Sequence, residues 1–158
     1  MCLPIRRHCG ILASLCLALA GVSYGKGQPD PRLDGAFRKP ENGWIYVHLQ
    51  GSPSAIGFQH GSLLRSEIED SKTAIELSTI HGVKHSWAEM RKLSDKLFVP
   101  KLTAEYREEL QGIVDGLRAH GSKLDFLDLV TMNAIRHFMF CDLTCIRCVL
   151  DLAPDLQP

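Results

Sequence analysis

The stretch Ser52-Pro-Ser-Ala-Ile-Gly57-Phe-Gln-His60-Gly61 contains the start of a helix and the feature that decides how that helix packs. Ser52 offers a hydroxyl group to cap free amides, and Pro53 suits the first helical position because no N–H group is needed there. Gly57 and Gly61 lie one turn apart and leave a strip of bare backbone that another element can approach closely. Each glycine costs about 1 kcal/mol of helix stability, which indicates a packing or functional role. His60 is either a hydrogen-bonded packing histidine or a group that touches substrate.

A second motif, Glu108-Glu109-Leu-Gln-Gly112-Ile-Val-Asp-Gly116, repeats the glycine spacing further along the chain. Glu109 and Gly112 are neighbours on one face of the predicted helix. Paired carboxylates can serve in acid–base catalysis. The other face of this helix is apolar, so solvated charges are the alternative interpretation of the same residues.

The spacing of apolar residues predicts three or four helices and one strand. Ser86 and Glu89 match a capping box, Pro100 interrupts the helical pattern, and Thr103 can cap the helix that follows. The predicted helices cover residues 52–82, 86–97, 103–121 and 124–134, and the predicted strand covers residues 44–50.

The fold class expected from this order is α/β, more narrowly α+β and mostly helical. Residues 26–43 are rich in proline, glycine and charge, and they predict an extended, irregular linker. A single strand over residues 44–50 leaves its backbone amides unpaired. The chain is therefore expected to be the N-terminal part of a larger α/β protein, with a domain that begins at residue 44.

Residues 1–25 have the pattern of a cleavable signal peptide. Arg6 and Arg7 precede an uncharged apolar run over residues 9–21, which is too short to span a bilayer. Cleavage is expected near Gly25 or, alternatively, after Ala20. The pattern predicts a secreted or periplasmic protein, and because no later segment is long and apolar enough, no stable membrane insertion is expected after cleavage.

Charge and cysteine usage narrow the function classes. The 158 residues include 18 Lys and Arg against 18 Asp and Glu, a balance that argues against a nucleic-acid partner. Cys141, Cys145 and Cys148 crowd the end of the chain, with no cysteine in residues 26–140. The Cys145–Cys148 spacing lacks a second ligand pair for zinc, so a chance cluster or one terminal disulfide is the expectation. No metal, cofactor or catalytic residue is predicted.

Several motifs in succession resemble one family of enzymes. The strand WIYVHLQG, the Gly57–Gly61 motif, Pro100-Lys-Leu, the Glu109–Gly116 motif and Asp-Leu-Val-Thr-Met-Asn133 follow one another over residues 43–134. In this order they resemble the N-terminal portion of the isopenicillin-N acyltransferase-like cysteine hydrolases, relatives of the phospholipase B-like proteins in the N-terminal-nucleophile superfamily. The matching motif positions, whose roles are open, are Gly57, His60, Gly61, Glu109, Gly112, Gly116 and Asn133.

The resemblance implies an αββα sandwich and an enzyme that cleaves its own precursor before a cysteine. The freed amine of that cysteine then acts as base for its own thiol, and the substrates implied are small acyl amides. In the family a small hydroxyl residue usually follows the cysteine. Asp, Ile and Val follow Cys141, Cys145 and Cys148, so none of the three fits.

Residues 135–158 resemble no part of the family and are expected to be a divergent tail. The leading hypothesis is therefore a truncated, exported homologue of acyltransferases and amidohydrolases that is inactive alone. The alternative is a small secreted helical binding module without catalysis, which the neutral charge and amphipathic helices support equally well.

Overall fold

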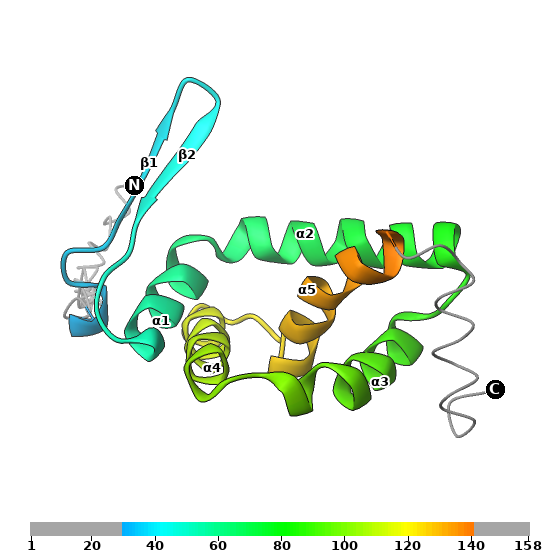
Figure 1. The fold of residues 1–158 in the computed structure, drawn as a ribbon. Helices are drawn as coiled ribbons and strands as arrows, with labels where there is room; N and C mark the ends of the chain where they lie inside the picture. Colours follow the sequence, from blue (N-terminus) through cyan, green and yellow to red (C-terminus); the bar gives the residue numbers. More distant parts are fainter. Residues whose placement is uncertain (1–29, 141–158) are drawn as a thin grey trace, which may run out of the picture.

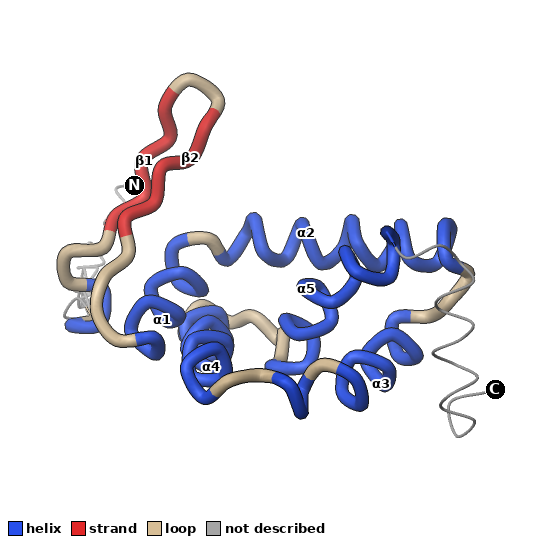
Figure 2. The backbone as a smooth tube through the Cα atoms, in the orientation of Figure 1, coloured by secondary structure: helices blue, strands red, loops and turns tan. Residues whose placement is uncertain are grey.

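The computed structural model describes residues 30–140, which form a body of helices with one β-hairpin projecting from it (Figures 1 and 2). The main elements are β1 (Phe37–Glu41), β2 (Trp44–His48), α1 (Pro53–Leu63), α2 (Arg65–Ser78), α3 (Trp87–Leu97), α4 (Ala104–Ala119) and α5 (Phe126–Phe140). Short helical turns lie at η1 (Pro31–Leu33), η2 (Thr79–Val83) and η3 (Val99–Lys101). The described residues confirm the expected mostly helical α+β class. The αββα sandwich remains a prediction.

The hairpin corrects two expectations for the N-terminal region. Strand β1 lies inside the predicted irregular linker, and it pairs antiparallel with β2, so the predicted strand is not alone. Asn42 and Gly43 both have positive φ angles, 51° and 81°, and form the two-residue turn between the strands. Asparagine and glycine tolerate this left-handed backbone, which matches the twist of paired strands. The linker was expected because its prolines and glycines suggested irregular chain, whereas Asn-Gly is a specific hairpin signal.

The predicted single helix over residues 52–82 is two helices. Leu64 leaves the helical region, with φ −119° and ψ 26°, and the chain changes direction between α1 and α2 (Figure 1). The two segments pack on different partners: α1 lies against α4, whereas α2 contacts α5. A straight helix with one apolar stripe was the simplest interpretation of the sequence, and these separate partners explain the break.

The predicted caps of α3 and α4 are confirmed. The Ser86 hydroxyl accepts a hydrogen bond from the Glu89 amide at 3.3 Å, and the Ser86 amide donates to the Glu89 carboxylate at 2.6 Å. The Thr103 hydroxyl accepts from the Tyr106 amide at 3.4 Å. Gly121 follows α4 with φ +84°, the left-handed geometry that ends helices.

Helix α5 begins two residues later than expected and continues past residue 134. Asp125 and Asp128 cap its start reciprocally, because each carboxylate accepts a hydrogen bond from the other residue's backbone amide, at 2.9 and 3.1 Å. The helix runs to Phe140, so the expected boundary between residues 134 and 135 falls within one element. The predicted signal peptide and the three C-terminal cysteines lie outside the described residues.

The core consists of two clusters that meet on α5. One cluster joins α3 to α5 through Trp87, Met90, Leu93 and Ala134. The other joins α4 to α5 through Ile113, Val114, Leu117 and Leu129. Met132 packs against both clusters, which places α5 between the two halves of the helical body (Figure 1). Within residues 30–140 no helix combines the length and the apolar character needed to cross a bilayer.

Candidate functional site

The two glycine motifs meet where α1 crosses α4. We call this contact, formed at Gly57, Gly61, Gly112 and Gly116, the glycine crossing. A β-carbon on Gly57 would lie 2.0 Å from the carbonyl oxygen of Glu109, and one on Gly116 would lie 2.2 Å from the carbonyl oxygen of Phe58. Equivalent distances are 2.1 Å from Gly61 to Ile113 and 2.4 Å from Gly112 to Ser54. A β-carbon at any of these positions would clash with a carbonyl oxygen of the other helix and push the helices apart. The absence of a β-carbon in the four glycines therefore allows the two backbones to be in contact. The close approach predicted from their spacing is confirmed.

Phe58 and Gln59 lie inside the first glycine motif and fasten the hairpin to α1. Gln59 is only 2% exposed. Its side-chain nitrogen donates to the Arg32 and Gln50 carbonyls at 2.7 and 3.0 Å, and its oxygen accepts from the Gln50 amide at 2.8 Å. The Arg32 guanidinium lies 3.5 Å above the centre of the Phe58 ring. Sequence reasoning passed over Gln59, because nothing local indicates which distant backbone a buried amide will bind.

Next to the crossing, a cavity of about 410 Å³ opens between α1, α4, α5 and the segment joining α3 to α4. Its lining residues are His60, Phe98, Leu102, Tyr106, Glu109, Leu110, Ile113, Val130, Asn133 and Ala134. Three of these, His60, Glu109 and Asn133, are motif positions that come from three different helices. The structure therefore brings together all the polar motif positions, while the four glycines stand at the neighbouring crossing.

The polar side chains of this cavity include His60 and Glu109, whose charge and hydrogen bonding differ. Burial lowers the pKa of His60, and the nearby Glu109 carboxylate opposes that effect by raising it. Because burial is the larger cause and the ordinary pKa is about 6.5, His60 is mainly uncharged at neutral pH. Within residues 30–140, neither the His60 ring nor the Glu109 carboxylate has a hydrogen-bond partner. Both groups are therefore available to a ligand.

Asn133 is exposed and lies at the edge of the cavity. Its side-chain nitrogen donates to the Leu129 carbonyl at 2.9 Å, which leaves the amide oxygen as an acceptor. His60 and Asn133 also line a smaller cavity of about 220 Å³, whose wall includes Ile68 and Ile75 of α2. The two residues thus stand between two hollow regions of the helical body.

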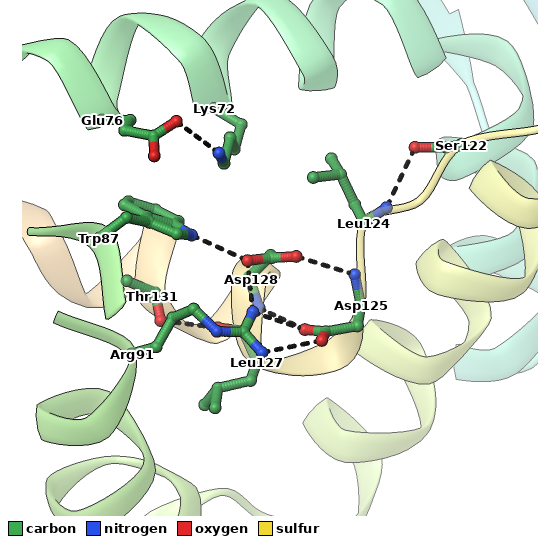
Figure 3. Close-up of polar contacts among 10 residues, drawn as sticks. All are labelled: Lys72, Glu76, Trp87, Arg91, Ser122, Leu124, Asp125, Leu127, Asp128 and Thr131. Atoms are coloured by element: carbon green, nitrogen blue, oxygen red, sulfur yellow. Dashed lines mark hydrogen bonds and ion pairs between the residues drawn. The ribbon is translucent and has the colours of Figure 1, made fainter. Parts of the chain in front are cut away.

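A separate ionic cluster ties α3 to the start of α5 (Figure 3). Arg91 pairs with Asp125 at 2.8 Å and also pairs with Asp128, which accepts from the Trp87 ring nitrogen at 2.9 Å. The Arg91 guanidinium lowers the pKa of Asp125 to about 2. The Lys72 ammonium lies 5.1 Å from the centre of the Trp87 ring. Each charged group here has a partner within the cluster, so the arrangement holds elements together. Sequence reasoning missed this cluster, because Arg91 lies 34 residues before Asp125 in the chain.

The described residues contain no group of three His, Cys, Asp or Glu side chains placed to hold a metal ion. Cysteine is absent from residues 30–140 as well, since the three C-terminal cysteines begin at Cys141. His60 and Glu109, which line the same cavity, can offer hydrogen bonds to a ligand.

Comparison with known proteins gives two similar sequences. An uncharacterised protein of Archaeoglobus fulgidus is 32% identical over 133 residues, which cover 75% of this chain and 21% of that protein. The 40 kDa form of an acyl-coenzyme A:6-aminopenicillanic-acid acyltransferase of Emericella nidulans is 33% identical over 101 residues, or 61% of this chain and 26% of that protein. None of the family models matches, and no solved structure matches. The chain spans about a quarter or less of each similar protein, and over that span it has a distant similarity to an acyltransferase.

Proposed function

We propose that this chain is the N-terminal, helical part of an exported cysteine acyltransferase or amidohydrolase that acts on acyl amides, and that it is inactive alone. One observation carries the proposal. His60, Glu109 and Asn133, three motif positions far apart in the sequence, line one cavity in a chain that is 33% identical to an acyltransferase over 101 residues.

The arrangement supports a scaffold better than a complete catalytic centre. Covalent acyl transfer needs an activated nucleophile, and the family's nucleophile is a cysteine. Residues 30–140 contain none. In this proposal the helical body supplies the cavity and the groups that face it, and the thiol comes from sequence outside residues 30–140. Export and self-cleavage are further parts of the same proposal.

A chimeric enzyme tests this role. The matching 101-residue segment of the Emericella acyltransferase is replaced by the corresponding segment of this chain. We expect the chimera to transfer acyl groups from acyl-coenzyme A to 6-aminopenicillanic acid, whereas the 158-residue chain alone gives no acyl-amide hydrolysis above buffer. A chimera that folds but is inactive contradicts the proposal. So does activity of the chain alone that Cys141→Ala abolishes.

The second candidate is a small secreted binding module without catalysis. It is favoured by the cavity itself, because lining residues within the described range 60–134 already enclose about 410 Å³. An inactive chimera, together with saturable ligand binding by the chain alone, would support this candidate over the first.

A further inference from the structure

The cavity beside the glycine crossing has the form of a small-molecule site. Its volume of about 410 Å³ falls within the range of about 300–1,000 Å³ that ligand pockets occupy. Phe98, Leu110 and Val130 contribute apolar wall, and they come from three different parts of the helical body. An apolar group of a ligand would gain stability there by leaving water.

The polar groups of the cavity present negative charge and hydrogen-bond acceptors. Glu109 is half-buried and its carboxylate has no hydrogen-bond partner within residues 30–140. Burial lowers the pKa of His60, so its ring is mainly neutral near pH 7 and can accept a hydrogen bond through one nitrogen. Asn133 uses its amide nitrogen on Leu129 and leaves its oxygen free.

The lining residues that the structure describes include no lysine or arginine, so none of them offers Glu109 a permanently charged partner. A cationic ligand in the cavity would form a charge-assisted hydrogen bond with the Glu109 carboxylate, which no described residue provides.

We propose that this cavity binds a small apolar primary amine, with the ammonium group on Glu109 and the apolar body against Phe98, Leu110 and Val130. The site goes beyond the proposed function, because the residues named for it belong to the described part of the chain and could serve an enzyme part and a binding module alike. A carboxylate of the same carbon skeleton binds most weakly, because its charge is repelled by Glu109. A neutral alcohol gains the apolar contacts and lacks the ion pair.

Matched six-carbon probes test the site on the purified full chain. Hexylamine, hexanol and hexanoate are titrated at about pH 7.5, where the amine is protonated, and amide chemical shifts are followed by NMR. We expect saturable binding of hexylamine about tenfold tighter than that of hexanol, with hexanoate the weakest. Shifts should centre on residues that line the cavity.

Glu109→Gln should weaken hexylamine binding about fivefold or more and leave hexanol unchanged, because it removes the charge and keeps the shape. Glu108→Gln is the matched control, since Glu108 is exposed and does not line the cavity. The proposal is overturned if hexanol or hexanoate binds as tightly as hexylamine, if hexylamine shows no saturable binding, or if both variants lose affinity equally. The comparison of probes on the unmodified protein decides the matter even if Glu109→Gln does not fold. The chimera assay can succeed or fail independently of these outcomes.

Discussion

A β-carbon on Gly57 would meet the Glu109 carbonyl oxygen at 2.0 Å, and that oxygen belongs to helical backbone that cannot rotate away. Gly57→Ala should therefore force α1 and α4 apart and lower the free energy of unfolding by about 2–3 kcal/mol, despite the better helix propensity of alanine. Urea denaturation measures the difference.

Gly82→Ala is the matched control for this substitution. Nothing lies within 4 Å of a β-carbon at Gly82, so the change should leave stability within about 1 kcal/mol of the original or raise it. Equal losses at the two positions would show that the crossing does not need bare backbone.

His60 should make stability depend on pH. Burial lowers the pKa of His60 in the folded protein below the value of about 6.5 in the unfolded chain. Between these two values the unfolded chain binds more protons, so the free energy of unfolding falls as pH drops through 6.5 and levels off below the folded pKa.

His60→Gln removes this titration. Urea denaturation between about pH 7.5 and 5.5 should show a shallower loss of stability in the variant than in the original protein. The same slope in both proteins would mean that His60 is not held in a buried, uncharged state.

Among the elements, the hairpin is anchored to α1 by the buried side chain of Gln59, together with the contact of Arg32 on Phe58. Gln59 makes three hydrogen bonds to the chain on either side of the hairpin. Gln59→Leu should leave the Gln50 amide without its partner, cost about 1–3 kcal/mol, and speed hydrogen exchange at that amide. Gln111→Leu is the control, because the Gln111 side chain is exposed and bonds only Asp115. Unchanged exchange at Gln50 would contradict the anchoring role.

The contact between α3 and α5 depends on Arg91. Arg91→Met keeps the aliphatic stem but leaves buried Asp128 without its cation, so the free energy of unfolding should fall by about 2 kcal/mol. Lys39→Met is the matched control, since the Lys39–Glu41 pair is exposed, and it should cost less than about 0.5 kcal/mol. Thermal or urea unfolding compares the two variants, and a similar cost for both would rule out a special role for the cluster.

The elements also show which features the sequence could predict. The Ser86 and Thr103 caps were predicted correctly because a cap is set by residues three positions apart. A close approach at each glycine motif was predicted because two glycines one helical turn apart leave bare backbone, but the sequence did not indicate that the two motifs meet each other. The break at Leu64 was missed because it depends on what α1 and α2 pack against, and the partner of Gln59 was missed for the same reason.

In the whole molecule, the cavity results from the way the helices pack against one another. The glycine crossing sets α1 on α4, and the Arg91 cluster sets α3 on α5 (Figures 1 and 3). Between these two contacts the helical body stays hollow, and His60, Glu109 and Asn133 face the space. Sequence alone indicated these residues by resemblance to a family, whereas their meeting in one cavity depends on the packing of three helices.

His60 and Glu109 share this cavity, and their proximity can be measured by an NMR titration of the His60 ring in the original protein and in Glu109→Gln. Because Glu109 raises the pKa of His60 against the effect of burial, we expect a His60 pKa below about 6.5 in the original protein and a lower value in the variant. Glu108→Gln, the control, should leave the His60 pKa unchanged. A His60 pKa in Glu109→Gln that equals or exceeds the value in the original protein, as in the control, would contradict the proximity of His60 and Glu109.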